Sequence, residues 1–338
     1  MDKELALGIL VEDSTPALLR VDPPNPIWRL NNNGRRWYFT LIDNVPKLYA
    51  SVTTFIKQSL PQAPQLMKWI ADVGYDESRA IMEEKAHYGT FMHIQIAELL
   101  IKREYDLDKL RIRMLQYAKE HNIPDSFVEQ SKEMAKDILA FAQFAKDCEV
   151  EPLAIEIVLY HPEDGYAGAI DLVCKMTVEE SGYFGEVYKT GEQKGQPKLT
   201  KGKVEVRAIV DFKSGRKGFY ESHEIQLQAY KEMWDIHFPT MPINRLYNWS
   251  PKDWRDRPSY NLTDQTNKKS LRKLPYLVAI AKLENKGAEE MTSMFFKGNI
   301  SLDSDFTENI TNQSLIDIIM GAKITNDAEL TDKGTENN

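Results

Sequence analysis

The spacing of apolar residues changes along the chain from a helical period to a strand period. Between about residues 63 and 147, apolar side chains recur every three or four positions, as in the segments 78–84 and 90–102. This period is typical of amphipathic helices, and the last of them is expected to start at 125 and run to about 147. Valine- and isoleucine-rich runs then predict strands over residues 154–160, 167–176 and 204–212.

The segments between and after these strands complete the predicted order of elements. Residues 178–203 are polar and contain several glycines and lysines, which indicates a long hairpin extension. The order of helices, three strands, a helix and a strand predicts an α/β fold with a mixed sheet flanked by helices. The elements expected after the third strand are a helix over 222–236, a strand over 244–249, an irregular segment over 250–266, a helix over 270–285 and a short amphipathic segment within 302–322.

The pattern predicts a single domain with a lead-in and a tail. Residues 1–48 hold an irregular proline-rich stretch, Asp22-Pro-Pro-Asn-Pro26, and then a hairpin whose turn is Asn33-Gly34. Residues 49–325 are expected to form one domain, and the polar residues 326–338 a disordered tail. The expected parts of the domain are a helical region over 49–150, a sheet core over 151–250 and C-terminal helices over 251–325.

Composition and charge narrow the functional class only slightly. The 338 residues carry a net charge of −8, from 51 acidic and 43 basic side chains, which argues against a protein that coats nucleic acid but allows one basic groove. The sequence shows no apolar run of the roughly 18 residues that a membrane span needs, and it opens on an acidic stretch, so we expect a cytoplasmic protein with no membrane partner. Cys148 and Cys174 are too few for a disulfide framework and are expected to be partly buried thiols.

Two charged residues stand at the end of the third predicted strand. The segment Val210-Asp-Phe-Lys-Ser-Gly215 places Asp211 and Lys213 two positions apart. Because successive side chains of a strand point to opposite faces, Asp211 and Lys213 share one face, and Val210 and Phe212 share the other. Aspartate and lysine are almost never buried unless they are paired, so charges among these apolar neighbours require an explanation.

A third charged residue, Asp171, lies inside the preceding strand. Ile170 and Leu172 bracket it, and the same alternation places these two apolar side chains together on the opposite face. If the two strands pair, Asp171 meets Asp211 and Lys213 at one point of the sheet. The alternative is a structural ion pair, in which the charges only stabilise one another.

Hydrolysis of a phosphodiester is a reaction for which these side chains are suited. Mg²⁺ prefers oxygen ligands, binds through one or two carboxylates and keeps several waters. Such a cation polarises a phosphoryl oxygen and lowers the pKa of a bound water. A nearby lysine can orient or deprotonate that water and offset the negative charge that develops in the reaction. Two carboxylates and a lysine are therefore a sufficient set for this chemistry.

Five short motifs resemble those of the PD-(D/E)XK nuclease superfamily, in particular its RecB-like exonuclease branch and the phage-type members. Each motif alone is weak, but their order and the elements that carry them are specific, and the resemblance extends from about residue 49 to residue 249. The matching segments are Gly89-Thr-Phe-Met-His93 for G-x-x-x-H, Glu156 for a strand glutamate, Gly168-Ala-Ile-Asp171 for G-x-x-D, Asp211-Phe-Lys213 for D-x-K and Gln226-Leu-Gln-Ala-Tyr230 for Q-x-x-x-Y.

The resemblance implies a restriction-endonuclease-like core that binds Mg²⁺ or Mn²⁺. In such a core Asp171 and Asp211 bind the metal, and the backbone carbonyl of Phe212 adds a ligand. His93 is implied to be a further metal ligand, although a lone histidine is more often a core or surface residue. Lys213 is implied to act on the attacking water.

The resemblance also implies roles for three neighbouring residues. Glu156 is implied to belong to the catalytic set. Gln226 and Tyr230 lie four residues apart, and therefore on one face of the predicted helix, where they would hold the DNA backbone or steady Lys213. The alternative for Gln226 and Tyr230 is simple packing of the helix on the sheet.

The sequence departs from the superfamily pattern at several points. Ile170 stands where the superfamily's name has a proline, as is common in this branch. The cysteines that hold an iron–sulfur cluster in some RecB-like enzymes are missing, so no iron–sulfur cluster is expected. The phosphate-binding motif of helicases is also missing. Any unwinding is therefore expected to come from a partner, such as a recombination or replication protein, unless the protein degrades DNA ends unaided.

Outside the motifs, two basic segments have alternative interpretations. In Trp249-Ser-Pro-Lys-Asp-Trp-Arg255, Lys252 and Arg255 are candidate contacts to DNA and the tryptophans are candidate stacking platforms, but packing of the rings on the core is an equal alternative. The lysines within residues 178–203 form either a solvated face or a contact to a DNA backbone. His87 and His223 have no motif and are expected at the surface.

These observations predict a metal-dependent DNA nuclease, most simply an exonuclease in DNA recombination, repair or end processing. One alternative is a catalytically silent nucleic-acid-binding module with the same fold, and another is a sequence-independent endonuclease. A third is a scaffold protein with an incidental site, which predicts no metal binding. The motifs leave open the polarity of digestion, the preference for single- or double-stranded DNA, the choice between DNA and RNA, and whether the chain forms an oligomer.

Overall fold

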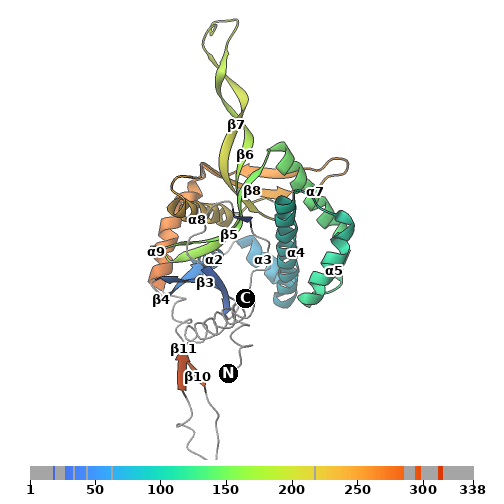
Figure 1. The fold of residues 1–338 in the computed structure, drawn as a ribbon, viewed down its shortest axis with the longest axis vertical. Coiled ribbons are helices and arrows are strands. Elements are labelled where there is room, and N and C mark those ends of the chain that lie inside the picture. The colour runs from blue at the N-terminus through green and yellow to red at the C-terminus, as the bar shows by residue number, and fades with distance from the viewer. Residues whose placement is uncertain are drawn as a thin grey trace, which may run out of the picture.

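The computed structural model describes residues 18–19, 27–32, 35–42, 45–61, 64–216, 218–284, 294–297 and 311–314. These residues form an α/β fold in which a mixed sheet of nine strands lies between two layers of helices (Figure 1). None of the helices described there is long and apolar enough to cross a membrane. The proline-rich stretch 22–26, the turn at Asn33-Gly34 and the tail 326–338 lie outside the described residues.

The N-terminal strands are part of the main sheet. The predicted hairpin is confirmed, since β2 (Ile27–Asn32) pairs antiparallel with β3 (Arg35–Ile42). β3 pairs in turn with β4 (Val45–Ser51), which then pairs in parallel with β6 (Tyr166–Val187). The expected boundary between residues 48 and 49 therefore falls inside a strand of the sheet.

The helical region predicted over residues 63–147 is confirmed, with one break. Helix α2 (Val52–Ser59) precedes this region. The region itself contains α3 (Pro64–Val73), α4 (Tyr75–Lys102), the short 3-10 helix η1 (Leu107–Lys109), α5 (Leu110–Glu120), α6 (Ser126–Glu129) and α7 (Ser131–Asp147). The expectation of one helix over 125–147 is wrong, because α6 and α7 are separated at Gln130, whose ψ is 6°. The side-chain amide of Gln130 binds Glu84 on α4, and the break directs Phe127 and Val128 into the core.

The three central strands are confirmed, as are the helix and the strand that follow them. They are β5 (Glu151–His161), β6, β7 (Pro197–Phe212), α8 (Glu221–His237) and β8 (Arg245–Pro251). β5 pairs antiparallel with β6 and with the short β1 (Leu18–Leu19). β7 pairs antiparallel with β6 and in parallel with β8, so the sheet is mixed.

The expectations for residues 251–325 are partly wrong. Residues 250–266 are not wholly irregular, because β9 (Tyr260–Asp264) pairs antiparallel with β8. Only Tyr260 and Leu262 of β9 pack on the core, which is too short an alternation to stand out in the sequence. The described part of this region is also not purely helical. It contains the 3-10 helix η2 (Lys269–Lys273), α9 (Leu274–Glu284), and a separate hairpin of β10 (Met294–Lys297) and β11 (Thr311–Ser314). Most of the amphipathic segment expected within 302–322 lies outside the described residues.

The sheet divides at the start of β6. On one edge, β6 pairs with β5 along most of their shared length. On the other edge, it pairs first with β4, at Tyr166 and Ala167, and then with β7, from Leu172 onwards. Residues 168–171 thus have no strand partner on this edge among the described residues. We call this gap the fork, and it contains Asp171.

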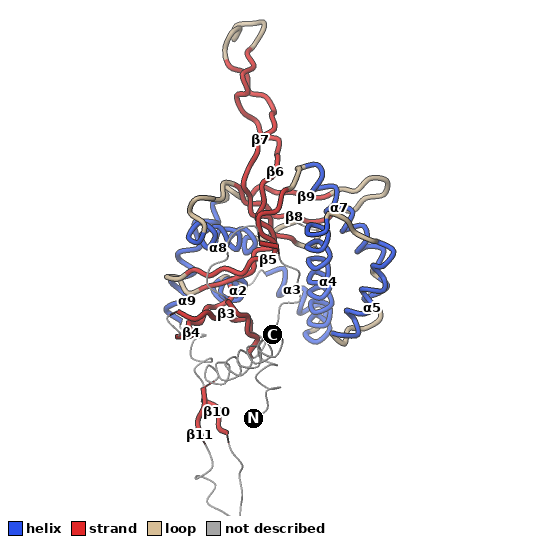
Figure 2. Tube along the Cα trace, viewed as in Figure 1, coloured by secondary structure: helices blue, strands red, loops and turns tan. Residues whose placement is uncertain are grey.

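Two apolar cores hold helices to the two faces of the sheet. Helices α4, α5 and α7 cover one face, with a core that includes Met92, Phe141 and Trp249. Helices α2, α8 and α9 cover the other face, with a core that includes Val52 and Trp234. Figures 1 and 2 show these two groups of helices on opposite sides of the central strands. Side chains from both helix layers can therefore reach a residue at the fork.

β6 and β7 extend beyond the body of the molecule as a two-stranded ribbon (Figure 1). Their pairing continues to Val187 and Pro197, and none of residues 179–203 is buried. This confirms the hairpin extension predicted for residues 178–203. We call residues 181–202 the β6–β7 ribbon.

Candidate functional site

The charged side chains of the predicted motifs gather at the fork. Burial raises the pKa of both Asp171 and Asp211, and the charge of Asp171 raises the pKa of Asp211 further. The charge of Lys213 lowers the pKa of both aspartates, so the three side chains lie close together. The predicted convergence of these three residues is therefore present. The contributing positions are Glu156 on β5, Asp171 on β6, Asp211 on β7, Lys213 just after β7, His93 on α4, and Gln226 and Tyr230 on α8.

Glu156 reaches the site through an unusual backbone conformation. It lies opposite Asp171, next to the pair formed by Ile155 and Leu172, and its φ is 53°. The other described non-glycine residues with positive φ each follow the end of a helix, so Glu156 is the only one of them inside a strand. A left-handed conformation costs a residue with a side chain about 1–3 kcal/mol and persists where its surroundings impose it, often at functional sites.

On β6, opposite Glu156, the two side chains that flank Asp171 lie on different faces of the sheet. Ile170 packs in the core under α8, whereas Leu172 packs in the core under α4. The prediction that these two residues share one face is therefore wrong, because the pairing of β5 with β6 is interrupted at Glu156. Regular alternation holds on β7, where Val210 and Phe212 both lie on the α4 side as predicted.

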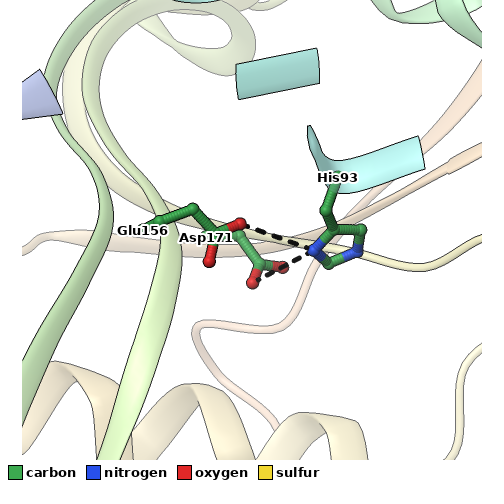
Figure 3. Close-up of side chains that lie close together, drawn as sticks. All are labelled: His93, Glu156 and Asp171. Atoms are coloured by element: carbon green, nitrogen blue, oxygen red, sulfur yellow. Dashed lines mark ion pairs between the residues drawn. The ribbon is translucent and has the colours of Figure 1, made fainter. Parts of the chain in front are cut away.

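His93 faces two carboxylates with one ring nitrogen and a carbonyl with the other. Its Nδ1 lies 3.6 Å from Glu156 Oε1 and 3.6 Å from Asp171 Oδ1, and Figure 3 shows both carboxylates directed toward the ring. Its Nε2 lies 3.2 Å from the carbonyl oxygen of Phe212. In the neutral ring, a proton on Nε2 is donated to that carbonyl and the lone pair of Nδ1 faces the carboxylates. The ring is thus oriented as a metal ligand.

Ligand atoms of His93, Glu156 and Asp171 lie within 4.8 Å of one another. Two carboxylates and an imidazole at this spacing fit a divalent cation such as Mg²⁺ or Mn²⁺. Two predicted ligands lie elsewhere. Asp211 is outside this group, and the Phe212 carbonyl lies on the far side of the His93 ring. The Phe212 backbone is still important, because its N–H donates to Asp171 Oδ2 at 2.6 Å.

Without a cation, the site holds buried carboxylates at an electrostatic cost. Burial raises the pKa of Asp171, and although His93 opposes this effect, the Glu156 carboxylate adds to it. Burial lowers the pKa of His93, but Asp171 and Glu156 outweigh burial and raise the pKa of this histidine to about 9. Burial also raises the pKa of Asp211. A divalent cation would relieve this cost, since it would place two positive charges beside the carboxylates.

Asp211 is held from two sides at the edge of the fork. Lys213 Nζ lies 2.9 Å from its Oδ1 and 2.8 Å from its Oδ2. Asn248 on β8 donates to Oδ2 at 2.7 Å, and Gln265 donates to the Asn248 side chain at 3.0 Å. Asp211, Asn248 and Gln265 are all buried. This chain of hydrogen bonds fixes the orientation of the carboxylate, which in turn fixes Lys213.

The helix motif on α8 lies beside Lys213. Gln226 Oε1 lies 3.5 Å from Lys213 Nζ, and the Gln226 amide donates to the Tyr230 hydroxyl at 2.6 Å. Tyr230 is buried, and burial together with the two aspartates of the site raises its pKa. The neutral hydroxyl therefore orients Gln226, and Gln226 orients Lys213. Of the two roles predicted for this motif, the arrangement favours steadying the lysine.

The loop that follows β7 is anchored to the helices by residues that sequence reasoning missed. Arg216 pairs with the buried Asp137 on α7, and Asp137 also accepts a hydrogen bond from Tyr88 on α4 at 2.8 Å. On the same loop, Ser214 Oγ lies 3.4 Å from the position that a Cβ on Gly89 would occupy. The glycine of the G-x-x-x-H motif therefore lets α4 approach this loop closely.

Asn248 and Gln265 were also missed, for different reasons. Asn248 has a weak signal, because it is a polar residue between Tyr247 and Trp249 in a predicted strand. Gln265 has none, because it lies in the segment expected to be irregular. No periodic pattern connects either residue to Asp211. The pairing of β7 with β8 places Asn248 opposite Asp211, and Gln265 reaches Asn248 because it follows β9, which pairs with β8.

The predicted DNA contacts Lys252 and Arg255 lie outside the group at the fork. Both are exposed on the loop after β8. Trp254, between them, donates to the Lys136 carbonyl at 3.4 Å, and the Lys136 ammonium lies 5.8 Å from the ring centroid. Trp254 thus packs on α7, as the packing interpretation expects, and a role for Lys252 and Arg255 in DNA binding stays a prediction.

His87 and His223, which were expected at the surface, are partly exposed and partly buried. His87 lies against Tyr117, with 3.4 Å between its Nδ1 and the hydroxyl. His223 lies on α8, where burial and the positive charge of Lys213 lower its pKa to about 4. It is therefore neutral at pH 7 and adds no positive charge beside Lys213.

Metal binding is expected to be competitive with protonation of His93. Below pH 9 the metal-free ring is protonated, because its pKa is about 9, and a cation at Nδ1 must displace this proton. The apparent Kd for Mn²⁺ should therefore fall by up to about tenfold for each pH unit between 7 and 9. Calorimetry in buffers of different ionisation enthalpy measures the released proton. His93→Ala should bind Mn²⁺ more weakly and with a flatter pH dependence, and an unchanged slope would contradict this role.

Gly168, at the fork, is expected to tolerate no side chain. A Cβ there would lie 2.9 Å from Tyr230 Cε1 and 3.4 Å from Val52 Cγ2, so α8 and α2 would have to shift. Gly168→Ala should lower the free energy of unfolding by about 1–3 kcal/mol, as overpacking does. Gly89→Ala is the matched control, since its Cβ meets only the flexible Ser214 side chain at 3.4 Å. Urea unfolding of both variants would test this, and equal stabilities would contradict it.

The site thus has two halves that meet at the fork. One half is the group of His93, Glu156 and Asp171, and the other is Lys213 with Asp211 and its buried partners. A scan against protein-family models and a search of the curated proteins find no match to this chain, so the geometry at the fork is the basis on which a function can be argued.

Proposed function

We propose that the protein is a metal-dependent nuclease that hydrolyses phosphodiester bonds in DNA, with a PD-(D/E)XK-type core. The observation that carries the proposal is the meeting of a cation-binding group with a positioned lysine at one point of the sheet. The segments that resemble D-x-K and Q-x-x-x-Y also adjoin in space, through Lys213 and Gln226. This agreement between motif order and geometry supports a nuclease over an incidental ion pair.

The cation-binding half is organised around the backbone of one residue, Phe212. His93, Glu156 and Asp171 would hold Mg²⁺ or Mn²⁺, which when bound supplies positive charge to phosphoryl oxygens and lowers the pKa of a water. The Phe212 N–H fixes Asp171, and the Phe212 carbonyl fixes the ring of His93. The backbone at the end of β7 therefore orients two ligands before any cation arrives, which lowers the cost of assembling the site.

Lys213 is the group suited to act on the attacking water. Its ammonium has three N–H donors, and Asp211 and Gln226 occupy the directions on one side of it. A remaining donor is available to a water or to a phosphate oxygen, and the positive charge opposes the negative charge that develops on the phosphate. Because Asn248 fixes Asp211, the position of the ammonium is set by buried hydrogen bonds rather than by a flexible surface.

Within this class we propose an exonuclease acting in DNA recombination, repair or end processing, as the RecB-like motifs indicate. The test is incubation of the purified protein with end-labelled linear DNA and covalently closed circular DNA, each single- and double-stranded. Every substrate is run with Mg²⁺, with Mn²⁺ and with chelator. We expect loss of linear DNA only when a divalent cation is present, with the circles left intact.

Other outcomes of this experiment identify the alternatives. Cation-dependent cutting of the circles would move the assignment to an endonuclease. DNA binding without cleavage under any condition would identify a silent binding module with this fold. Absence of both cleavage and Mn²⁺ binding, the latter measured by calorimetry, would overturn the nuclease proposal and leave the charges at the fork as a structural network.

A further inference from the structure

The β6–β7 ribbon receives little support from the rest of the molecule. At its base, Glu180 pairs with Arg245 at 2.7 Å and Lys203 pairs with Glu149 at 3.6 Å. Beyond these pairs, no ion pair joins residues 181–202 to the body within the described part of the chain, and Figure 1 shows the ribbon projecting from it. A two-stranded hairpin is marginally stable alone in water. An arm of this length therefore calls for a partner that it contacts.

The two faces of the ribbon differ. On one face, Phe184 lies over the backbone of Gly182 and Gly202, where an added Cβ would approach its ring to 3.1 Å and 2.7 Å. On the other face, Tyr183 and Leu199 lie directly across from each other, and they are 71% and 57% exposed. The aromatic ring packed on two glycines stiffens the arm. The exposed side chains of Tyr183 and Leu199 form a small apolar patch on the ribbon, which also carries charged residues.

The charge of the ribbon is opposite to that of the whole chain. The ribbon holds four lysines and two glutamates, a net charge of +2, whereas the chain carries −8. Lys198 and Lys201 lie on the β7 strand, and Lys189 and Lys194 lie at the tip. Of these, Lys189, Lys194 and Lys201 have no ion-pair partner among the residues that the structure describes. A local positive field on an acidic protein attracts a polyanion to this arm.

The reach of the ribbon is comparable to a short length of DNA. The same two strands carry Asp171 and Asp211 at the fork and form the ribbon at their other end. At about 3.3 Å per residue, the tip near Val187 lies about 50 Å along β6 from Asp171. At about 3.4 Å per base pair, this length corresponds to about 15 base pairs of duplex.

We propose that the β6–β7 ribbon binds the phosphate backbone of double-stranded DNA whose end lies at the fork. This inference rests on the proposed nuclease function and names its substrate as a duplex of about 15 base pairs or more. A duplex is straight over this length, so it holds its phosphates at fixed positions beside a stiff arm. A flexible single strand has no such fixed register.

A second copy of the chain is a weaker candidate for the occupant. Pairing of two ribbons through Tyr183 and Leu199 would bring two arms of net charge +2 together, and like charges repel. Phosphates instead complement the lysines on β7 and at the tip. Duplex DNA therefore satisfies the charge of the arm, whereas a second ribbon does not.

The test compares two variants with equal changes of charge. In the ribbon variant, Lys189, Lys194, Lys198 and Lys201 are all replaced by glutamine. In the control variant, four exposed helix lysines are replaced in the same way, namely Lys85, Lys119, Lys132 and Lys146. Binding to fluorescent duplexes of 8, 16 and 24 base pairs is measured by anisotropy, with chelator present and over a series of salt concentrations.

We expect wild type and the control variant to bind the 24-base-pair duplex at least tenfold more tightly than the 8-base-pair duplex. The ribbon variant should lose most of this gain, and its slope of log K against log salt should be smaller by about 2–4, since each lost phosphate contact removes about 0.9. Replacement of residues 181–202 by Asn-Gly should remove the gain as well, which guards against a poorly folded point variant.

Three results would overturn the inference. Equal losses in the ribbon and control variants would mean that only total charge matters. If the affinity of wild type for DNA does not depend on duplex length, the ribbon does not contact the duplex. A change from dimer to monomer by light scattering, with unchanged DNA binding, would assign the ribbon to a contact between copies. Length-dependent binding without any cleavage would retain the ribbon contact and overturn only the nuclease proposal.

Discussion

Replacing Asp171 by asparagine is expected to lower the rate of metal-dependent DNA cleavage by about 10³-fold or more, which corresponds to about 4 kcal/mol in the barrier. Asparagine can keep the hydrogen bond from the Phe212 N–H, so the fold is preserved, but it removes one charged ligand from the group with His93 and Glu156. The measurement is the initial rate on linear DNA with Mn²⁺, together with the Kd for Mn²⁺ by calorimetry. Activity within tenfold of wild type would contradict the assigned role.

The same substitution should make the metal-free protein more stable. Burial raises the pKa of Asp171 above 3.8, so its ionised form costs stability in the folded state. The cost is present at neutral pH and disappears as the pH falls below 3.8, where both folded and unfolded forms are protonated. Asparagine is neutral at all pH values, so we expect the metal-free variant to be more stable than wild type at pH 7 and this gain to disappear at acidic pH.

Thermal unfolding with chelator would measure this gain, with Asp72→Asn on the exposed face of α3 as the matched control. Saturating Mn²⁺ should reverse the order, because a ligand that binds only the folded state stabilises wild type by mass action. A variant less stable than wild type in chelator would show that Asp171 serves the fold rather than a cation.

Replacing Lys213 by alanine is the substitution expected to separate binding of the cation from the reaction. Lys213 lies beside Asp211 and outside the group of His93, Glu156 and Asp171. We expect cleavage to fall by about 10²–10³-fold, as when one positioned donor is removed from a reaction site. The Kd for Mn²⁺ should stay the same or fall, because a nearby positive charge is lost.

The control for Lys213→Ala is Lys231→Ala, which removes a lysine paired with Asp235 on α8, outside the site. Single-turnover rates with excess protein would separate the chemical step from binding of DNA. A Lys213→Ala variant that loses Mn²⁺ binding in parallel with cleavage would place the lysine in a structural role. Rates within threefold of wild type would remove it from the mechanism.

The parts of the fold that the sequence predicted are those set by local periodicity. Valine- and isoleucine-rich runs predicted β5, β6 and β7, because a buried strand needs apolar residues over its whole length. Asp171, Asp211 and Lys213 were recognisable for the same reason, since charges interrupt those runs. β9 and the break at Gln130 were missed because each depends on a few contacts with distant elements rather than on a repeated pattern.

The division of labour within the site could not be predicted from the order of motifs. The motifs put Asp211 with the metal and Glu156 in the catalytic set, whereas the structure brings Glu156 to His93 and pairs Asp211 with Lys213 and Asn248. Two non-local features cause this difference. One is the left-handed backbone at Glu156, and the other is the parallel pairing of β7 with β8. Neither leaves a trace in the spacing of residues.

The tip of the β6–β7 ribbon also divides the site between two stretches of chain. His93, Glu156 and Asp171 all precede the tip, and Asp211 and Lys213 all follow it. Exposed tips are where chain breaks are best tolerated. A protein cut at Gly191 would therefore be a split protein, in which neither fragment holds both the candidate cation ligands and the lysine. The complete site would form only when the two fragments bind each other through the β6–β7 pair, so its assembly would depend on the concentration of both fragments.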